Sequence, residues 1–205
     1  MKTKKYNKKL ILKIIIGSTR EGRFSEKVAK WVFNEIKSDP EIICEILDLR
    51  DYPMPFFNSA IYPSLANKKY DNPVIQEWSN KIDEADGFLI ISPEYNAGYP
   101  AVLKNALDVI YPEWNKKPVG FISYGSVMGS RSIEQLKQVS LSLQMHPIKN
   151  SINIPNEIFF KAMNEEEDQA IKTLQTLTLK KPNPVYKCLS ELIEWAKILK
   201  KGRYN

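Results

Sequence analysis

The sequence predicts an α/β protein in which one parallel β-sheet lies between two layers of helices. Short apolar runs alternate along the chain with longer amphipathic segments, and this alternation is typical of βαβ units. Each run is rich in Ile, Leu, Val or Phe, as expected of a strand that is buried on both faces. Five such strands are predicted, at residues 10–17, 42–48, 87–92, 118–123 and 147–154.

The segments between and after these strands predict the covering helices. In the first helix, Ser25 is suited to the N-cap position and precedes an apolar stripe that includes Val28, Val32 and Ile36. The predicted helices are residues 25–37, 72–85, 100–110, 130–145, 165–179 and 185–200. Five parallel strands with a final packed helix favour the flavodoxin-like three-layer sandwich, with strand order 2-1-3-4-5, over the six-stranded dinucleotide-binding form.

The longest irregular stretch runs from residue 49 to about residue 71 and contains Phe56, Phe57 and Tyr62 among several prolines. Loops of this length in a compact domain are commonly functional. The alternative is a surface excursion that is packed by its own aromatic side chains.

The chain has 205 residues and a formal net charge of +6. Five of these six excess charges come from the lysines at positions 2, 4, 5, 8 and 9. We therefore expect a solvated basic tail at residues 1–9 and a single domain at residues 10–205, with neither a nucleic acid nor a membrane as partner.

The apolar run that follows this tail superficially resembles a signal peptide. Lys13 interrupts the run, however, and no small-residue cleavage site follows it. Cys44 and Cys188 lie far apart without the spacing of a metal or redox site, and we expect both to be small buried residues. These features favour a cytoplasmic protein.

The loop after the first strand has the composition of an anion-binding site. Residues 17–25 combine two glycines, three hydroxyl side chains and two arginines immediately before a helix. Free backbone N–H groups and the helix dipole favour a bound anion there, and an arginine can bind a phosphate through two nitrogens. The loop lacks both the Walker ending and the GxGxxG spacing.

Two further loops lie at the same edge of the predicted sheet. Residues 92–100 after the third strand offer backbone donors, an amide and two aromatic rings, and residues 124–130 after the fourth strand are mostly small. A planar heterocycle needs this combination, because its edge is read by hydrogen bonds while its face stacks on an apolar surface.

Together, Gly17-Ser18-Thr19-Arg20 after a first strand and Pro93-Glu94-Tyr95-Asn96 after a third resemble the NADPH-dependent FMN reductase family. The similarity extends from about residue 14 to residue 155. It implies a flavodoxin-like fold, FMN as cofactor, NADPH or NADH as co-substrate, and a flavin, quinone or azo compound as the electron acceptor.

The resemblance also implies which residues hold the cofactor. Ser18, Arg20 and Ser25 match the phosphate-binding positions, and Arg23 and Phe24 lie in the same loop. The ring-binding positions match Pro93, Glu94, Tyr95 and Asn96 on one side of the isoalloxazine and Tyr124, Gly125 and Ser126 on its pyrimidine side. The third loop departs from the family pattern, because Ser126, Val127 and Met128 stand where glycines are common.

The chemistry of such an enzyme belongs to its cofactor, so we expect no catalytic triad and no metal. His146 is the only histidine and is expected to be structural, and Glu94 is expected to shape its turn. The resemblance further implies a homodimer or homotetramer, and Tyr111, Trp114 and Met128 are candidates either for a subunit contact or for ordinary core packing.

Two other functions stay open from the sequence. An electron carrier of the flavodoxin kind would bind FMN without oxidising NADPH, but a pI near 9.1 and Arg20 in the first loop disfavour it. A nucleic-acid-binding protein would use the lysine tail and would show steeply salt-dependent binding.

Overall fold

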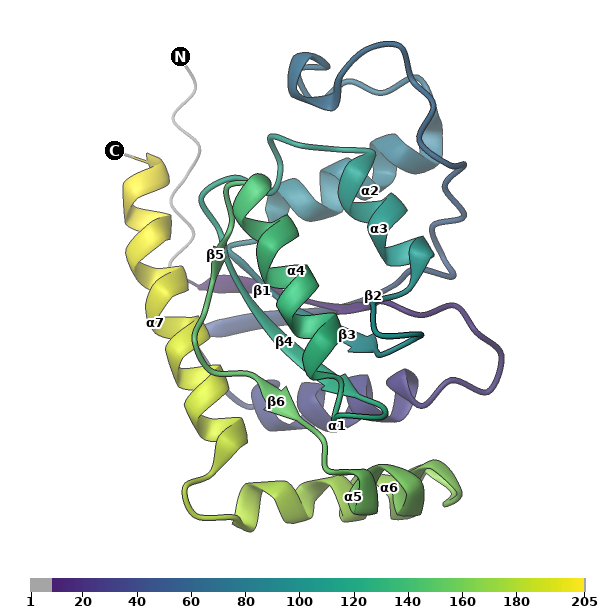
Figure 1. Ribbon diagram of the computed structural model, residues 1–205. Helices are drawn as coiled ribbons and strands as arrows, with labels where there is room; N and C mark the ends of the chain where they lie inside the picture. Colours follow the sequence, from purple (N-terminus) through teal and green to yellow (C-terminus); the bar gives the residue numbers. More distant parts are fainter. Residues whose placement is uncertain (1–8, 205) are drawn as a thin grey trace.

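The computed structural model describes residues 9–204, which form a parallel sheet between two helical layers (Figure 1). The strand order is β2-β1-β3-β4-β5, with β6 also paired to β4, so the predicted fold class and strand order are confirmed. The strands are β1 (Leu10–Ile16), β2 (Ile42–Asp48), β3 (Gly87–Pro93), β4 (Pro118–Tyr124), β5 (His146–Pro147) and β6 (Ile152–Asn153).

Each face of the sheet carries its own apolar core. One face packs against α1 (Ser25–Ile36), α5 (Asn156–Met163), α6 (Glu167–Gln175) and α7 (Pro184–Tyr204). The other packs against α2 (Pro73–Glu84), α3 (Ala101–Asp108) and α4 (Ser130–Ser142). Because successive side chains of a strand point to opposite faces, Ile14 and Ile15 of β1 contribute to different cores. The final helix α7 confirms the predicted extra C-terminal helix.

The predicted fifth strand, residues 147–154, is wrong as one continuous strand. It is divided into the two-residue strands β5 and β6. Between them, the backbone N–H groups of Lys149 and Asn150 donate to the Glu191 carboxylate of α7 at 3.0 and 2.9 Å. A side-chain acceptor therefore replaces the neighbouring strand over this stretch, and the ladder is interrupted.

Two helix predictions also need correction. Ser25 is the first residue of α1 and not its N-cap, because Phe24 before it already has helical φ and ψ and Ser25 makes no capping hydrogen bond. The predicted helix 165–179 is α6 followed by a short 3₁₀ helix, Thr176–Leu179. Helix α5 was not predicted, although it follows Pro155 and turns Ile158 and Ala162 into the core.

The two cysteines, His146 and Trp114 all have structural positions outside the three loops. Cys188 is buried as expected, but Cys44 is only half-buried. Both are free, and burial raises the pKa of each thiol to about 12, so neither is a thiolate at neutral pH. The His146 ring packs against Trp195 at 4.0 Å between centroids, and His146 pairs with Pro118 at the start of β4, at the opposite end of that strand from the loop that follows it. Trp114 is fully buried against Phe88, so it belongs to the core and not to a subunit contact.

Of the predicted basic tail, residues 1–8 lie outside the described residues. Within residues 9–204, no helix is long and apolar enough to cross a membrane.

Candidate functional site

A cavity of about 310 Å³ opens at the carboxyl edge of the sheet, where the loops after β1, β3 and β4 meet. This is the edge at which open α/β sheets bind ligands. The three loops and α5 contribute its walls: Arg20, Gly22, Arg23, Phe24, Pro93, Glu94, Tyr95, Tyr124, Gly125, Ser126, Phe159, Phe160 and Met163. The structure thus brings together nine of the twelve predicted site residues, and the other three, Ser18, Ser25 and Asn96, lie within the same loops.

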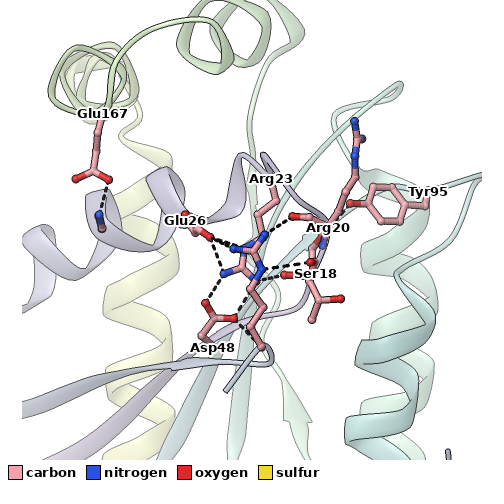
Figure 2. Close-up of polar contacts among 10 residues, drawn as sticks. Ser18, Arg20, Arg23, Glu26, Asp48, Tyr95 and Glu167 are labelled. Atoms are coloured by element: carbon pink, nitrogen blue, oxygen red, sulfur yellow. Dashed lines mark hydrogen bonds and ion pairs between the residues drawn. The ribbon is translucent and has the colours of Figure 1, made fainter. Parts of the chain in front are cut away.

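The two arginines of the first loop have different environments (Figure 2). The Arg23 guanidinium is buried and binds both Asp48 carboxylate oxygens, Glu26 and the Ser18 carbonyl oxygen. Burial alone would lower the pKa of Arg23, but its bonds to Asp48 and Glu26 outweigh that effect and raise it. Arg23 therefore fastens the first loop to the end of β2.

Arg20, in contrast, is exposed and points away from the Arg23–Asp48 pair (Figure 2). Its guanidinium makes no hydrogen bond or ion pair with the rest of residues 9–204. Its backbone is nevertheless held, because Arg50 donates to the carbonyl oxygens of Thr19 and Arg20 at 3.2 and 2.6 Å. The first loop therefore presents one cation with free donors from a fixed backbone, which suits a bound phosphate.

Ser25 is the first residue of α1, next to the cavity residue Phe24, and its hydroxyl group is unsatisfied. Its Oγ is buried and makes no hydrogen bond of normal geometry among the described residues. The neighbouring Tyr124 hydroxyl is also buried, and burial raises its pKa more than the nearby Ser25 lowers it. A buried polar atom without a partner is costly, and a ligand oxygen at the helix N-terminus would satisfy it.

The second loop is a tight turn that touches the first loop. Tyr95 and Gly98 exchange backbone hydrogen bonds of 2.8 and 3.0 Å, with Asn96 and Ala97 at positive φ between them. The Tyr95 hydroxyl lies 2.9 Å from Ser18 Oγ (Figure 2). Asn96 is exposed at the tip of the turn and does not line the cavity.

Glu94 has a nearly buried carboxylate that accepts from both the backbone N–H and the Nη1 of Arg131, each at 3.2 Å. Arg131 lies in the first turn of α4, where a negative charge is favourable. Glu94 therefore fastens the second loop to α4 and has no free oxygen directed at a reacting group.

The third loop approaches the second closely at Gly125. Its φ is +132°, and a Cβ atom at this position would lie 3.0 Å from the Glu94 Cβ. Only glycine combines that backbone conformation with the close approach. Met128 also has a positive φ of 55°, and Asn153 of β6 donates to its carbonyl oxygen at 2.9 Å.

These residues fit a cofactor that has an anionic end and a planar ring. Arg20 provides an unsatisfied donor in the cavity and Ser25 another in the same loop, and Pro93, Tyr95 and Tyr124 provide flat apolar surfaces along the cavity wall. A model of the family described as NADPH-dependent FMN reductase matches residues 11–158. The chain belongs to this family. It is therefore an oxidoreductase that uses FMN and NADPH.

Individual relatives of this FMN reductase family agree with the assignment. The chain is 36% identical over 146 residues to an NAD(P)H-dependent FMN reductase of Schizosaccharomyces pombe, covering 70% of this chain and 73% of the relative. It is 32% identical over 181 residues to an NADPH:quinone oxidoreductase of Arabidopsis thaliana, covering 80% and 89%. The fold matches FerB, an NAD(P)H:acceptor oxidoreductase from Paracoccus denitrificans, with a TM-score of 0.59 at 20% identity over 82% and 98% of the two chains.

In this family the bound FMN supplies the redox chemistry, because it accepts a hydride from the nicotinamide and passes electrons on. The residues of the protein would bind this cofactor, orient it and shield it. Sequence reasoning missed the support that Asp48, Glu26 and Arg50 give to the first loop, although Asp48 and Arg50 stand at the carboxyl end of a predicted strand. It also missed α5, whose adjacent Phe159 and Phe160 were the available signal.

Proposed function

We propose that this protein transfers reducing equivalents from NADPH, through FMN, to a small quinone, azo or flavin acceptor. A quinone is included because the NADPH:quinone oxidoreductase of Arabidopsis thaliana matches 80% of this chain. NADPH is preferred over NADH in this proposal, in keeping with the family description.

The cofactor site in this proposal is the 310 Å³ cavity. Ser18, Arg20 and Ser25 bind the phosphate, while Arg23 and Phe24 hold the loop that carries them. The ring lies between Pro93, Glu94 and Tyr95 on one side and Tyr124, Gly125 and Ser126 on the other, while Asn96, at the exposed tip of the second loop, lies outside the cavity lining. The observation that carries the assignment is the Arg20 guanidinium, which lines this cavity and has no partner among residues 9–204, in the same loop as the buried, unsatisfied Ser25 hydroxyl.

Reduction of a quinone by the purified protein tests this proposal. We expect a yellow protein, or one that becomes yellow with added FMN, that oxidises NADPH only when a quinone is supplied. A yellow protein that leaves NADPH unoxidised under these conditions would instead be an electron carrier of the flavodoxin kind. A colourless protein that does not bind FMN would contradict both functions.

We also propose that residues 10–205 act as one FMN-binding domain that pairs into a homodimer in the cytoplasm. The long loop between β2 and α2 supports pairing, since Phe56 and Tyr62 keep 78% and 72% of their surface exposed. Exposed apolar patches of this kind commonly mark protein contacts. Two free, protonated cysteines are compatible with a reducing compartment. Sedimentation equilibrium would give the number of subunits.

A further inference from the structure

Helix α5 contributes three large apolar side chains, Phe159, Phe160 and Met163, to the cavity in which we place FMN. The family model ends at residue 158, so these side chains are a feature of this chain beyond the matched region. Phe160 and Met163 are three residues apart and therefore lie on the same side of the helix. They keep 57% and 40% of their surface exposed beside a cavity that already has a cation on its first loop.

The buried side of α5 fixes these two residues in place. Phe159 packs edge to face on Phe24 of the first loop at 5.2 Å between ring centroids, and it contacts Tyr124 of β4 at 5.1 Å. Ile158 and Ala162 lie in the core beneath the helix. The aromatic chain from the first loop through Tyr124 to α5 makes the helix continuous with the predicted phosphate-binding and ring-binding loops.

Hydrogen bonds hold the start of α5 to the third loop and its end to α1. At its start, Asn156 Nδ2 donates to the Ser126 carbonyl oxygen of the third loop at 3.1 Å. At its end, Lys27 of α1 donates to the carbonyl oxygens of Ala162 and Met163 at 3.3 and 3.2 Å and to that of Glu165. Lys27 thereby provides the positive charge that a helix C-terminus favours.

We propose that α5 is a wall of the FMN site, with Phe160 and Met163 packed against the uncharged part of the bound cofactor. This inference rests on the FMN function proposed above. Arg20 and Ser25 account for the charged end of such a ligand, but a flavin also has a large apolar ring, whose burial needs apolar surface on the protein. Phe160 and Met163 are the exposed apolar side chains that line this cavity from a rigid helix.

Fluorescence titration of the full-length apoprotein with FMN tests the wall. Phe160→Ser/Met163→Ser should weaken FMN binding by about 10- to 50-fold, because two apolar contacts are lost. Phe160→Leu/Met163→Leu should stay within about threefold of the unmodified protein, because apolar surface is restored. Leu179→Ser is the control, since Leu179 is even more exposed than Phe160 and Met163, at 79%, but does not line the cavity.

Titration with riboflavin, which lacks the phosphate, separates the wall from the phosphate loop. The serine variant should lose affinity for riboflavin by the same factor as for FMN. A serine variant that binds FMN within threefold of the unmodified protein would contradict the proposal that α5 is a wall of the site. A loss of affinity for FMN without a loss of affinity for riboflavin would also contradict it. Failure of the unmodified protein to bind FMN would instead reject the underlying function.

Discussion

Two segments that do not belong to the regular βα alternation begin at the carboxyl edge of the sheet. They differ in how their apolar side chains pack. The first is the loop of residues 49–72 between β2 and α2, and the second is the segment of residues 154–183 between β6 and α7. Figure 1 shows the first extending away from the sheet on the side of α2 and α3, and the second lying alongside α1. Both carry exposed aromatic side chains, but only the second packs them beside the cavity.

The long loop is attached near its two ends and has little packing between them. Near its start, the Asn105 side chain of α3 bonds to the backbone of Pro55 and Phe57 at 2.8 and 2.9 Å. Near its end, the Tyr70 hydroxyl donates to the buried Glu113 carboxylate at 3.0 Å. The aromatic side chains of Phe56, Phe57 and Tyr62 keep 78%, 42% and 72% of their surface exposed, which argues against an excursion packed by its own aromatic side chains.

The α5 segment, in contrast, divides its apolar side chains between the core and the cavity. Ile158 and Ala162 are buried, whereas Phe160 faces the cavity. The exposed aromatic side chains of the two segments therefore suit different partners. A rigid apolar face beside a cation suits a small cofactor, and a broad exposed loop suits a second protein surface.

The anchor of the long loop gives the largest expected effect. Glu113→Ala should lower the free energy of unfolding by about 3 kcal/mol, because the buried hydroxyls of Tyr70 and Ser79 lose their acceptor. Burial and the neighbouring Glu113 both raise the pKa of Tyr70, so its hydroxyl remains a donor. Urea denaturation measures the loss.

Glu113→Gln is the control, because it keeps one acceptor oxygen and should cost about half as much. FMN affinity should stay within about twofold in both variants, since neither Glu113 nor Tyr70 lines the 310 Å³ cavity. A large loss of FMN affinity in folded Glu113→Gln would show that the long loop, and not only α5, supports the cofactor.

The second largest effect is expected when the unpaired Arg20 guanidinium of the first loop is removed. Arg20→Ala should weaken FMN binding by about 1.5–3 kcal/mol, which is roughly 10- to 150-fold in the dissociation constant. Its unfolding free energy should change little, because the guanidinium has no partner within residues 9–204. Riboflavin binding should be unaffected. Unchanged FMN affinity in a fluorescence titration would remove Arg20 from the site.

The regular part of the fold was predictable because its signal is local. Short runs of mostly apolar residues identify the first four strands, and the apolar stripe of α1 identifies that helix. The break in the fifth strand depends on Glu191, about 40 residues further along, whose carboxylate takes the N–H groups of Lys149 and Asn150. No pattern within residues 147–154 indicates the contact with Glu191.

The same distinction holds within the site. The glycines, hydroxyls and arginines of residues 17–25 indicated an anion site, but they did not distinguish Arg20 from Arg23. The two arginines differ because the carboxylate of Asp48, which is distant in sequence, binds the Arg23 guanidinium. Helix α5 was missed because it has only eight residues, two of them core-facing apolar side chains, which is too short for a clear helical period.

Release of α5 from α1 should have a smaller effect. Lys27→Met removes the hydrogen bonds to the end of α5 but keeps the aliphatic stem, and should lower the unfolding free energy by about 1 kcal/mol. We also expect faster hydrogen exchange in residues 156–163 and about threefold to tenfold weaker FMN binding. Lys30→Met is the matched control, because it removes only the exposed pair with Glu167 and should cost less than about 0.5 kcal/mol. Equal exchange rates in the two variants would show that Lys27 does not hold α5.

Substitution of the exposed aromatics of the long loop should have the smallest effect on the chain itself. Phe56→Ser/Tyr62→Ser should change the unfolding free energy of the monomer by less than about 0.5 kcal/mol, because both side chains are already mostly in water. If the loop contacts a second subunit, the same variant should shift sedimentation equilibrium toward the monomer, whereas Phe160→Ser on α5 should not. A variant that associates as strongly as the unmodified protein would remove the loop from the subunit contact. The two segments would then differ only in how firmly they are held, and the aromatic side chains of the loop would need another partner.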